Sequence, residues 1–186
     1  MSIKTTSITF TAVGVALNIV LAMIILGLKI PFLFMDTMGT ILVGAVLGPV
    51  FGALTGLITN IITAMVNNPV ELPFAIVNMS IGIVVGLISR HFGFKIKAAI
   101  ITGLIISIVA PLIGTPIAVY VFGGLTGGSI DIVTGWLAKS GQKIFSAAFF
   151  PRIASNLIDK VASCIIAATI IAKIPQSLLR KLKGDN

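Results

Sequence analysis

The chain has 186 residues, of which 57% are hydrophobic and only 10% are charged, and its mean hydropathy is +1.16. A soluble domain carries about 25% charged residues, so this composition excludes a soluble globular protein and indicates a polytopic membrane protein. The net charge of +8 does not point to a nucleic-acid partner, because the basic residues flank apolar segments instead of forming a patch.

The apolar segments predict an all-α protein with six transmembrane helices in one domain that covers residues 1–186. The second helix is short and ends at Gly48-Pro49, and the fifth contains two prolines. A long segment, 123–150, separates the last two helices, and a short basic tail after the sixth is expected to lie on the membrane surface. The predicted helices are 8–28, 36–48, 50–66, 74–90, 98–122 and 152–173.

The distribution of Lys and Arg predicts that both termini lie in the cytoplasm. With this orientation, eight basic residues flank the inner ends of the helices and five lie toward the outside. The inner residues are Lys4, Arg90, Lys95, Lys97, Lys173, Arg180, Lys181 and Lys183, and the outer residues are Lys29, Lys139, Lys143, Arg152 and Lys160.

Polar side chains inside the predicted helices fall mostly in the outer half of the membrane, whereas the inner halves are almost entirely apolar. Ionisable and amide groups are costly in a bilayer, so they tend to face a cavity or one another. We therefore expect a cavity that opens to the outside. Its candidate lining residues include Asn60, Asn78, Tyr120, Asn156, Asp159 and Lys160.

Structural roles stay open for several of these residues. Asn60 and Asn78 could join helices through hydrogen bonds. Asp159 and Lys160 could pair with partners on other helices, but we expect no direct pair, because adjacent residues on a helix do not face each other. Asp36 precedes an apolar run and could cap the second helix.

Small residues predict close helix contacts. Ala12 and Ala16 form a smooth face in the inner half of the first helix, which either packs within the chain or meets a partner. Glycines at a spacing of four allow the second and third helices to approach closely; they are Gly44, Gly48, Gly52 and Gly56.

Motifs for catalysis are missing from the sequence. It has no G-x-x-x-x-G-K-[ST] for ATP and no Cys/His cluster for a metal or haem, so we expect no enzyme activity, no cofactor and no metal. A cavity without catalytic groups favours a subunit for binding or transport. Uphill transport would need an ion gradient or the ATPase of another chain.

Three segments in this order resemble the substrate-binding S-component of energy-coupling factor (ECF) transporters: IPFLFMDTMGTILVGAVLGPVFGALTGLITNII, PFAIVNMSIGIVVGLI and ASNLIDKVASCII. The resemblance implies that the chain captures a vitamin or a vitamin precursor outside a bacterial cell membrane. It also implies delivery to a transmembrane coupling protein and two cytoplasmic ATPases, which supply the energy for uptake.

The resemblance also implies roles for particular residues. The alanine-rich face of the first helix, here Ala12 and Ala16, would meet the coupling protein. The loop between the first two helices would form a lid over the pocket, which implies a lid role for Phe32, Phe34 and Asp36. Substrate-binding roles would fall by position on the outer polar residues named above.

The substrate is less constrained, because several members of this family stack a flat vitamin ring on Trp and Tyr, whereas this chain has only Trp136 and Tyr120. We expect a pyridoxine-like or hydroxymethylpyrimidine-like ligand first and a cobalamin-like ligand second. Two other functions stay open. One is a stand-alone ion-coupled transporter in which Asp159 titrates, and the other is a membrane sensor or assembly subunit.

Overall fold

A computed structural model describes residues 5–28, 30, 32–128 and 130–183, and all regular secondary structure within them is helical. The prediction of an all-α membrane bundle is therefore confirmed. Five helices are long and apolar enough to cross a membrane, and one shorter apolar helix, α2, accompanies them. The long helices are α1 (Thr5–Leu28), α3 (Pro49–Val66), α4 (Ala75–Phe92), α5 (Ile96–Phe122) and α7 (Ile144–Lys173), and α2 is Met38–Leu47.

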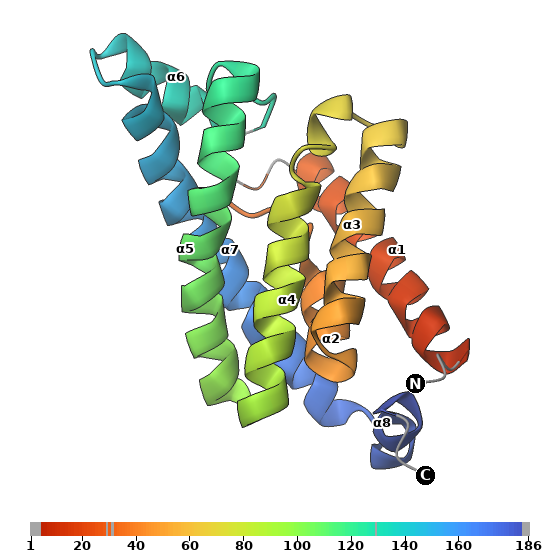
Figure 1. The fold of residues 1–186 in the computed structure, drawn as a ribbon. Coiled ribbons are helices and arrows are strands. Elements are labelled where there is room, and N and C mark those ends of the chain that lie inside the picture. The colour runs from red at the N-terminus through yellow and green to blue at the C-terminus, as the bar shows by residue number, and fades with distance from the viewer. Residues whose placement is uncertain (1–4, 29, 31, 129, 184–186) are drawn as a thin grey trace.

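The long helices run side by side (Figure 1). The 3₁₀ turn η1 (Pro69–Glu71) and the short helix α6 (Asp131–Lys139) lie at one end, which we call the outer end in keeping with the predicted orientation. The start of α1, the turn between α4 and α5, and the terminal helix α8 (Gln176–Lys183) lie at the other, inner end. Loop 32–37 is set back from the outer end toward the middle of the bundle (Figure 1).

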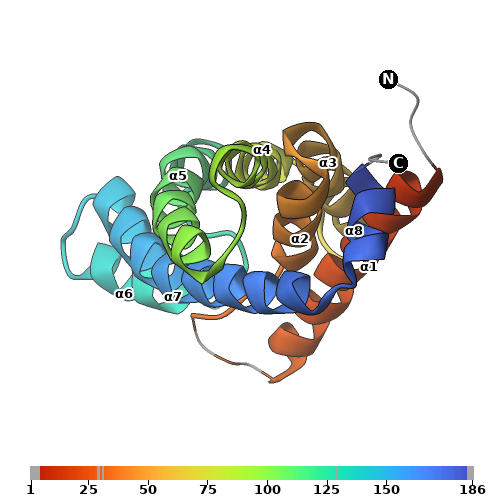
Figure 2. The ribbon, with the colours of Figure 1, turned by 90° about the horizontal axis from the view of Figure 1, so that it is seen from below.

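Helix α2 lies in the centre of one half of the bundle, in contact with α1, α3, α4 and α7. All its residues except Leu47 are buried, which explains why it is apolar on every side. Seen from the inner end, α5 lies on the side of the bundle away from α1, and α7 runs along one face of the bundle from α6 to α8 (Figure 2). The fold thus holds α2, and the loop that precedes it, against the inward face of α7.

Close backbone contacts hold α2, α3 and α4 together. A methyl group added to Gly52 would lie 2.7 Å from the carbonyl oxygen of Gly82 and 2.8 Å from the Cα of Gly44. The predicted glycine contact between the second and third helices is confirmed, and it extends to α4. Only glycine permits helices to approach this closely without displacement of the backbone.

The region before the sixth predicted helix differs from the prediction. Helix α7 begins at Ile144, eight residues before the predicted start, and Pro151 lies inside it. Proline is tolerated within membrane helices, where neighbouring groups can satisfy the carbonyl that it leaves free, so α7 continues through Pro151. The predicted connecting segment also forms the helix α6.

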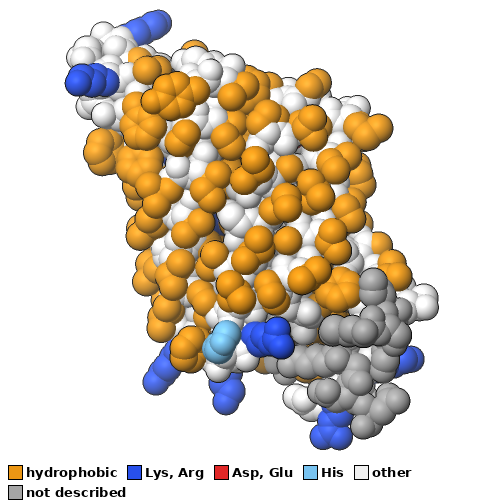
Figure 3. All heavy atoms as spheres, viewed as in Figure 1, with side chains coloured by type: hydrophobic (Ala, Val, Ile, Leu, Met, Phe, Trp, Pro, Cys, Tyr) orange, Lys and Arg blue, Asp and Glu red, His pale blue; other side chains and the backbone are white. Residues whose placement is uncertain are grey.

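The lateral surface is apolar, as expected for a surface that faces lipid. Figure 3 shows hydrophobic side chains over most of one face, with Lys and Arg at its two ends. Exposed Leu, Ile or Val side chains occur on every long helix. The basic tail forms α8, which packs beside the start of α1, where the hydroxyl of Ser7 donates to the backbone carbonyl of Leu182 at 3.3 Å.

Candidate functional site

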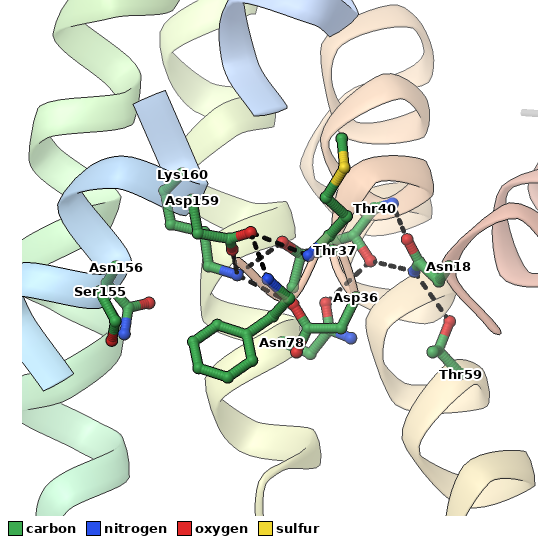
Figure 4. A network of polar contacts seen from close by, with 12 residues as sticks. Asn18, Asp36, Thr37, Thr40, Thr59, Asn78, Ser155, Asn156, Asp159 and Lys160 are labelled. Atoms are coloured by element: carbon green, nitrogen blue, oxygen red, sulfur yellow. Dashed lines mark hydrogen bonds and ion pairs between the residues drawn. The ribbon is translucent and has the colours of Figure 1, made fainter. Parts of the chain in front are cut away.

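A buried ion-pair cluster joins α7 to the start of α2 (Figure 4). The ammonium of Lys160 donates to the carboxylates of Asp159 at 2.7 Å and Asp36 at 3.0 Å, and to the hydroxyl of Thr37 at 2.9 Å. Asp159 is fully buried and Lys160 nearly so, whereas half of the Asp36 side chain is exposed. The cluster therefore reaches from the protein interior to a solvent-exposed edge at Asp36.

Loop 32–37 is held to α7 through its backbone. One carboxylate oxygen of Asp159 accepts hydrogen bonds from the N–H groups of Phe34 at 2.9 Å and Met35 at 2.8 Å. Phe32 and Met35 have φ angles of 62° and 51°, a left-handed conformation that is uncommon for residues other than glycine. Such conformations persist where surrounding contacts impose them, and Asp159 supplies such a contact for Met35.

Asn18 connects α1 to two other helices. Its amide nitrogen donates to the hydroxyls of Thr40 on α2 at 2.9 Å and Thr59 on α3 at 3.0 Å. Its oxygen accepts from the N–H of Gly39 at 2.6 Å. Asn18 is fully buried, so these bonds offset the cost of placing an amide in the bundle interior.

The same network continues toward the outer end. Thr40 donates to the oxygen of Asn78 on α4 at 2.8 Å, and Asn78 donates to the oxygen of Asn60 on α3 at 2.8 Å. Asn60 in turn donates to the backbone carbonyl of Glu71 at 3.0 Å and to its carboxylate at 3.4 Å. A continuous line of polar contacts thus connects four membrane helices to η1.

A cavity of about 60 Å³ lies along this line of contacts. Its volume suits a few water molecules. The described residues that line it are mostly amides, hydroxyls and carboxylates: Asn18, Ala22, Asp36, Thr59, Asn60, Thr63, Glu71 and Asn78.

Glu71 lies at the outer end of this cavity, in the turn η1 that connects α3 to α4 outside the membrane-spanning helices. Burial raises the pKa of its carboxyl from 4.5 to about 7, and the nearby negative charge of Asp36 adds to the shift. The group therefore changes its charge near neutral pH.

Two residues expected in the pocket lie apart from these contacts. Tyr120, near the outer end of α5, is 82% exposed. Asn156 donates to the carbonyl of Arg152 in its own helix at 2.8 Å, and Figure 4 shows it separated from the hydrogen-bonded cluster. Positions 152, 156 and 160 share a helix face, but a rise of 1.5 Å per residue puts the first and last about 12 Å apart.

Arg152 belongs to a second polar group at the outer end. Its guanidinium lies 3.8 Å from the carboxylate of Asp131 on α6. The other oxygen of Asp131 accepts from the N–H groups of Thr126 and Gly127, both at 2.6 Å. These contacts fix the connection between α5 and α6.

Two expectations about charged residues were wrong. Asp36 does not cap α2: that helix has Thr37 at its N-cap position without a side-chain capping bond, and Asp36 pairs with Lys160 instead. Asp159 and Lys160 do pair directly. Their Cβ atoms point in different directions, but the flexible four-carbon stem of lysine carries its ammonium back to the adjacent carboxylate.

Ala12 and Ala16 are exposed on α1. Packing within this chain, which was one of the two interpretations of the small-residue face, is therefore wrong. Gly14, on the opposite side of the helix, faces the interior, where an added methyl group would collide with Val43 and Gly39.

Several residues of the polar network were not expected from the sequence. Asn18 gives a detectable signal, because it is an amide in an otherwise apolar helix. The threonines give little signal, since a threonine hydroxyl can bond a carbonyl of its own helix anywhere in a bundle. The residues missed as site candidates are Asn18, Thr37, Thr40, Thr59 and Glu71.

Chemically, the arrangement can bind and orient a polar molecule. Among the described residues, no group of three or more His, Cys, Asp or Glu side chains is placed to hold a metal ion. The ion-pair cluster offers carboxylates and one ammonium beneath loop 32–37, and the neighbouring network offers amides. These are groups that recognise hydroxyl, amine and ring-nitrogen functions.

Comparison with known proteins adds one result. Residues 6–171 match the model of a family described as ECF transporter, substrate-specific component. No curated protein and no solved structure matched the chain.

Proposed function

Since this chain belongs to the family of substrate-specific components of ECF transporters and is a membrane-embedded substrate-binding subunit, we propose that it captures a vitamin or a vitamin precursor outside a bacterial cell. Uptake then requires partners, namely a transmembrane coupling protein and two cytoplasmic ATPases. The chain remains a multi-pass protein of the cell membrane throughout and hydrolyses no ATP itself.

The observation that carries this proposal is the convergence of polar side chains beneath loop 32–37. Asn60 and Asn78 belong to one hydrogen-bonded set with Thr40. Asp159 and Lys160 on α7 belong to a second set with Asp36 and Thr37, and residues 36–40 of the chain bring the two sets together. Such groups are costly in a membrane. A requirement to bind a polar molecule accounts for their retention at one depth.

The substrate is a small heteroaromatic molecule of the pyridoxine or hydroxymethylpyrimidine type. The cavity of about 60 Å³ must enlarge to admit either ligand, and a small heteroaromatic molecule requires a far smaller rearrangement than a cobalamin-like ligand. Hydroxyl and ring-nitrogen groups of such a molecule match the amides and carboxylates available. Loop 32–37, with Phe32, Phe34 and Asp36, acts as the lid that lifts to admit it.

The partner surface is the exposed face at Ala12 and Ala16 on α1. Small side chains let another helix approach closely, and close approach supplies the packing contacts that drive association within lipid. This face lies in the inner half of the helix, on the side where the ATPases would be reached.

The direct test is identification of the small molecule that co-purifies with the protein. Mass spectrometry of extracts from purified protein should find one polar heteroaromatic compound, and the compound should rebind to stripped protein with one-to-one stoichiometry. Extracts that contain only lipid, together with no binding from a panel of vitamins and precursors, would contradict the proposal. A cobalamin in the extract would contradict the substrate class alone.

Dependence on partners is tested by uptake in cells. Uptake of the identified compound should require co-expressed coupling protein and ATPases, and should stop when the ATPases carry an inactive nucleotide site. Uptake by this chain alone that collapses with the proton or sodium gradient would identify a secondary transporter instead.

A further inference from the structure

The cavity between α1, α3, α4 and η1 has a bias toward negative charge and hydrogen-bond acceptors, which a neutral substrate would not require. The described residues on its wall include two carboxylates, those of Asp36 and Glu71, and no basic side chain. Asn18, Thr59, Asn60 and Asn78 on the same wall are all buried. Asp36 is half exposed, so the cavity has a charged edge that solvent can reach.

Hydrogen bonds within the wall consume most of its donors. Both amide protons of Asn18 are directed to threonine hydroxyls, and the amide nitrogen of Asn60 donates to two oxygens of Glu71. The hydroxyls of Thr59 and Thr63 donate to backbone carbonyls of α3 at 2.8 Å. The wall therefore presents an occupant mainly with oxygen lone pairs.

The charge of the surrounding described groups has the same sign. The carboxylates of Asp36 and Glu71 line the cavity. Asp36 also pairs with Lys160, which pairs with Asp159, and Lys160 is the one ammonium among the described residues bonded to these carboxylates. Helices α1, α2 and α3 contain no charged residue. Arg152 contacts Asp131 and the connection between α5 and α6 instead.

We propose that this cavity binds a compact monovalent cation, either an alkali ion or a protonated amino group. Free oxygen lone pairs and carboxylates on the wall supply the ligands, and its volume of about 60 Å³ accommodates such an ion with part of its hydration shell. A divalent ion is a poorer match, because Ca²⁺ and Mg²⁺ favour sites with more free carboxylate oxygens, and Asp36 already pairs with Lys160.

The site goes beyond the proposed capture function, since it requires no vitamin to be present. It is tested on the full-length protein stripped of co-purified ligand, in detergent or nanodiscs at pH 8 and constant ionic strength. Thermal unfolding is measured in chloride salts of Na⁺, K⁺, Li⁺, NH₄⁺ and methylammonium, with choline as the reference because its bulk should keep it out of the cavity. At least one compact cation should raise Tm saturably relative to choline.

Two variants and one matched control locate the effect. Glu71→Gln, which removes one wall carboxylate, should abolish the saturable rise in Tm, and Thr63→Val, which removes one neutral oxygen, should weaken the apparent affinity at least threefold. Asp131→Asn removes a carboxylate at the same end of the protein but outside the cavity, so it should retain the cation response even if its baseline Tm is lower.

The salts that raise Tm identify the source of the cation. A response to Na⁺, K⁺ or Li⁺ assigns a free ion, and a response only to NH₄⁺ and methylammonium assigns the amino group of a ligand; either supports the site. Equal Tm in every salt, or a cation response that Glu71→Gln leaves intact, would overturn it. Both of those results leave vitamin capture untouched, because rebinding of the co-purified compound is measured separately.

Discussion

The ammonium of Lys160 on α7 lies 3.0 Å from the carboxylate of Asp36, although 124 residues separate them in the chain. With the direct pair between Lys160 and Asp159, this contact fixes the loop before α2 to the inward face of α7. The loop's position therefore depends on a few charged groups, and removal of each one has a distinct expected outcome.

Asp159→Asn should lower the free energy of unfolding by about 3 kcal/mol, because it leaves the buried ammonium of Lys160 with one carboxylate partner and weakens the bonds to loop 32–37. Thermal unfolding in detergent measures the effect. The double variant Asp159→Asn/Lys160→Met should recover part of the loss, since it also removes the charge left behind. A single variant as stable as the wild type would contradict a structural role for the pair.

The Asn78→Ala and Asn156→Ala variants distinguish two locations for the substrate pocket. If the pocket lies beneath loop 32–37, Asn78→Ala should weaken ligand binding at least tenfold, or about 1.4 kcal/mol. Asn156→Ala should then have little effect, because its amide bonds to its own helix. Calorimetric titration of the identified ligand measures both, and the opposite pattern would place the pocket nearer to the outer half of α7.

Substitution at the α1 face tests the coupling surface. Ala12→Trp and Ala16→Trp should abolish uptake in cells that express the partners, since a bulky ring prevents close approach of a second helix, while ligand binding to the purified variant stays unchanged. Ile108→Trp on α5 is the matched control, because it adds a ring at another exposed position. Loss of ligand binding in the α1 variants would instead indicate damage to the fold.

Gly52→Ala should lower the free energy of unfolding by about 1–3 kcal/mol, because its methyl group would collide with the backbones of α2 and α4. Gly27→Ala is the control, since nothing lies within 4 Å of the position where its methyl group would be. That variant should be neutral or more stable, by up to about 1 kcal/mol, because alanine favours helix. Equal stability of the two variants would contradict the close α3–α4 contact.

The pH dependence of stability should change in Glu71→Gln. The pKa of Glu71 is raised from 4.5 to about 7 by burial and by Asp36, so between these values the folded state binds more protons than the unfolded state. The contribution of Glu71 to stability is therefore complete below about pH 4.5 and is lost as the pH rises to about 7.

Replacement of Glu71 by the uncharged Gln removes this loss. Above pH 7, Glu71→Gln should exceed the wild type in stability by an amount on the order of 1 kcal/mol, reduced by solvent screening of the partly exposed group. The difference between the two proteins should vanish near pH 4.5. Parallel curves of Tm against pH would show that Glu71 titrates at an ordinary value.

The membrane helices were predictable from sequence because their signal, a long apolar run, is local. Loop 32–37 was not predictable in the same way, since its path depends on hydrogen bonds to Asp159, more than 120 residues further along the chain. The start of α7 was misplaced for a related reason. Proline has a strong local preference against helix, and packing in the bundle overrides it at Pro151.

The grouping of Asn60 with Asn78 followed from their shared depth, since an amide in an apolar helix needs a polar partner at the same level of the membrane. The threonines in the same network carried no comparable signal. Thr59 bonds its own helix and also accepts from Asn18, whereas Thr169 bonds its own helix on an exposed surface. The two residues look alike in sequence, and only tertiary structure separates them.

Helix α2 has 10 residues and α3 has 18, so their lengths are about 15 Å and 27 Å. Loop 32–37 before α2 is therefore re-entrant, with irregular backbone at a depth where bulk water is scarce. There the Asp159 carboxylate accepts hydrogen bonds from the N–H groups of Phe34 and Met35, a role that water would have at a protein surface. If the loop moves outward, these bonds break, and water must then hydrate both N–H groups and the Asp159 carboxylate. Opening of the loop therefore requires water to enter the bundle.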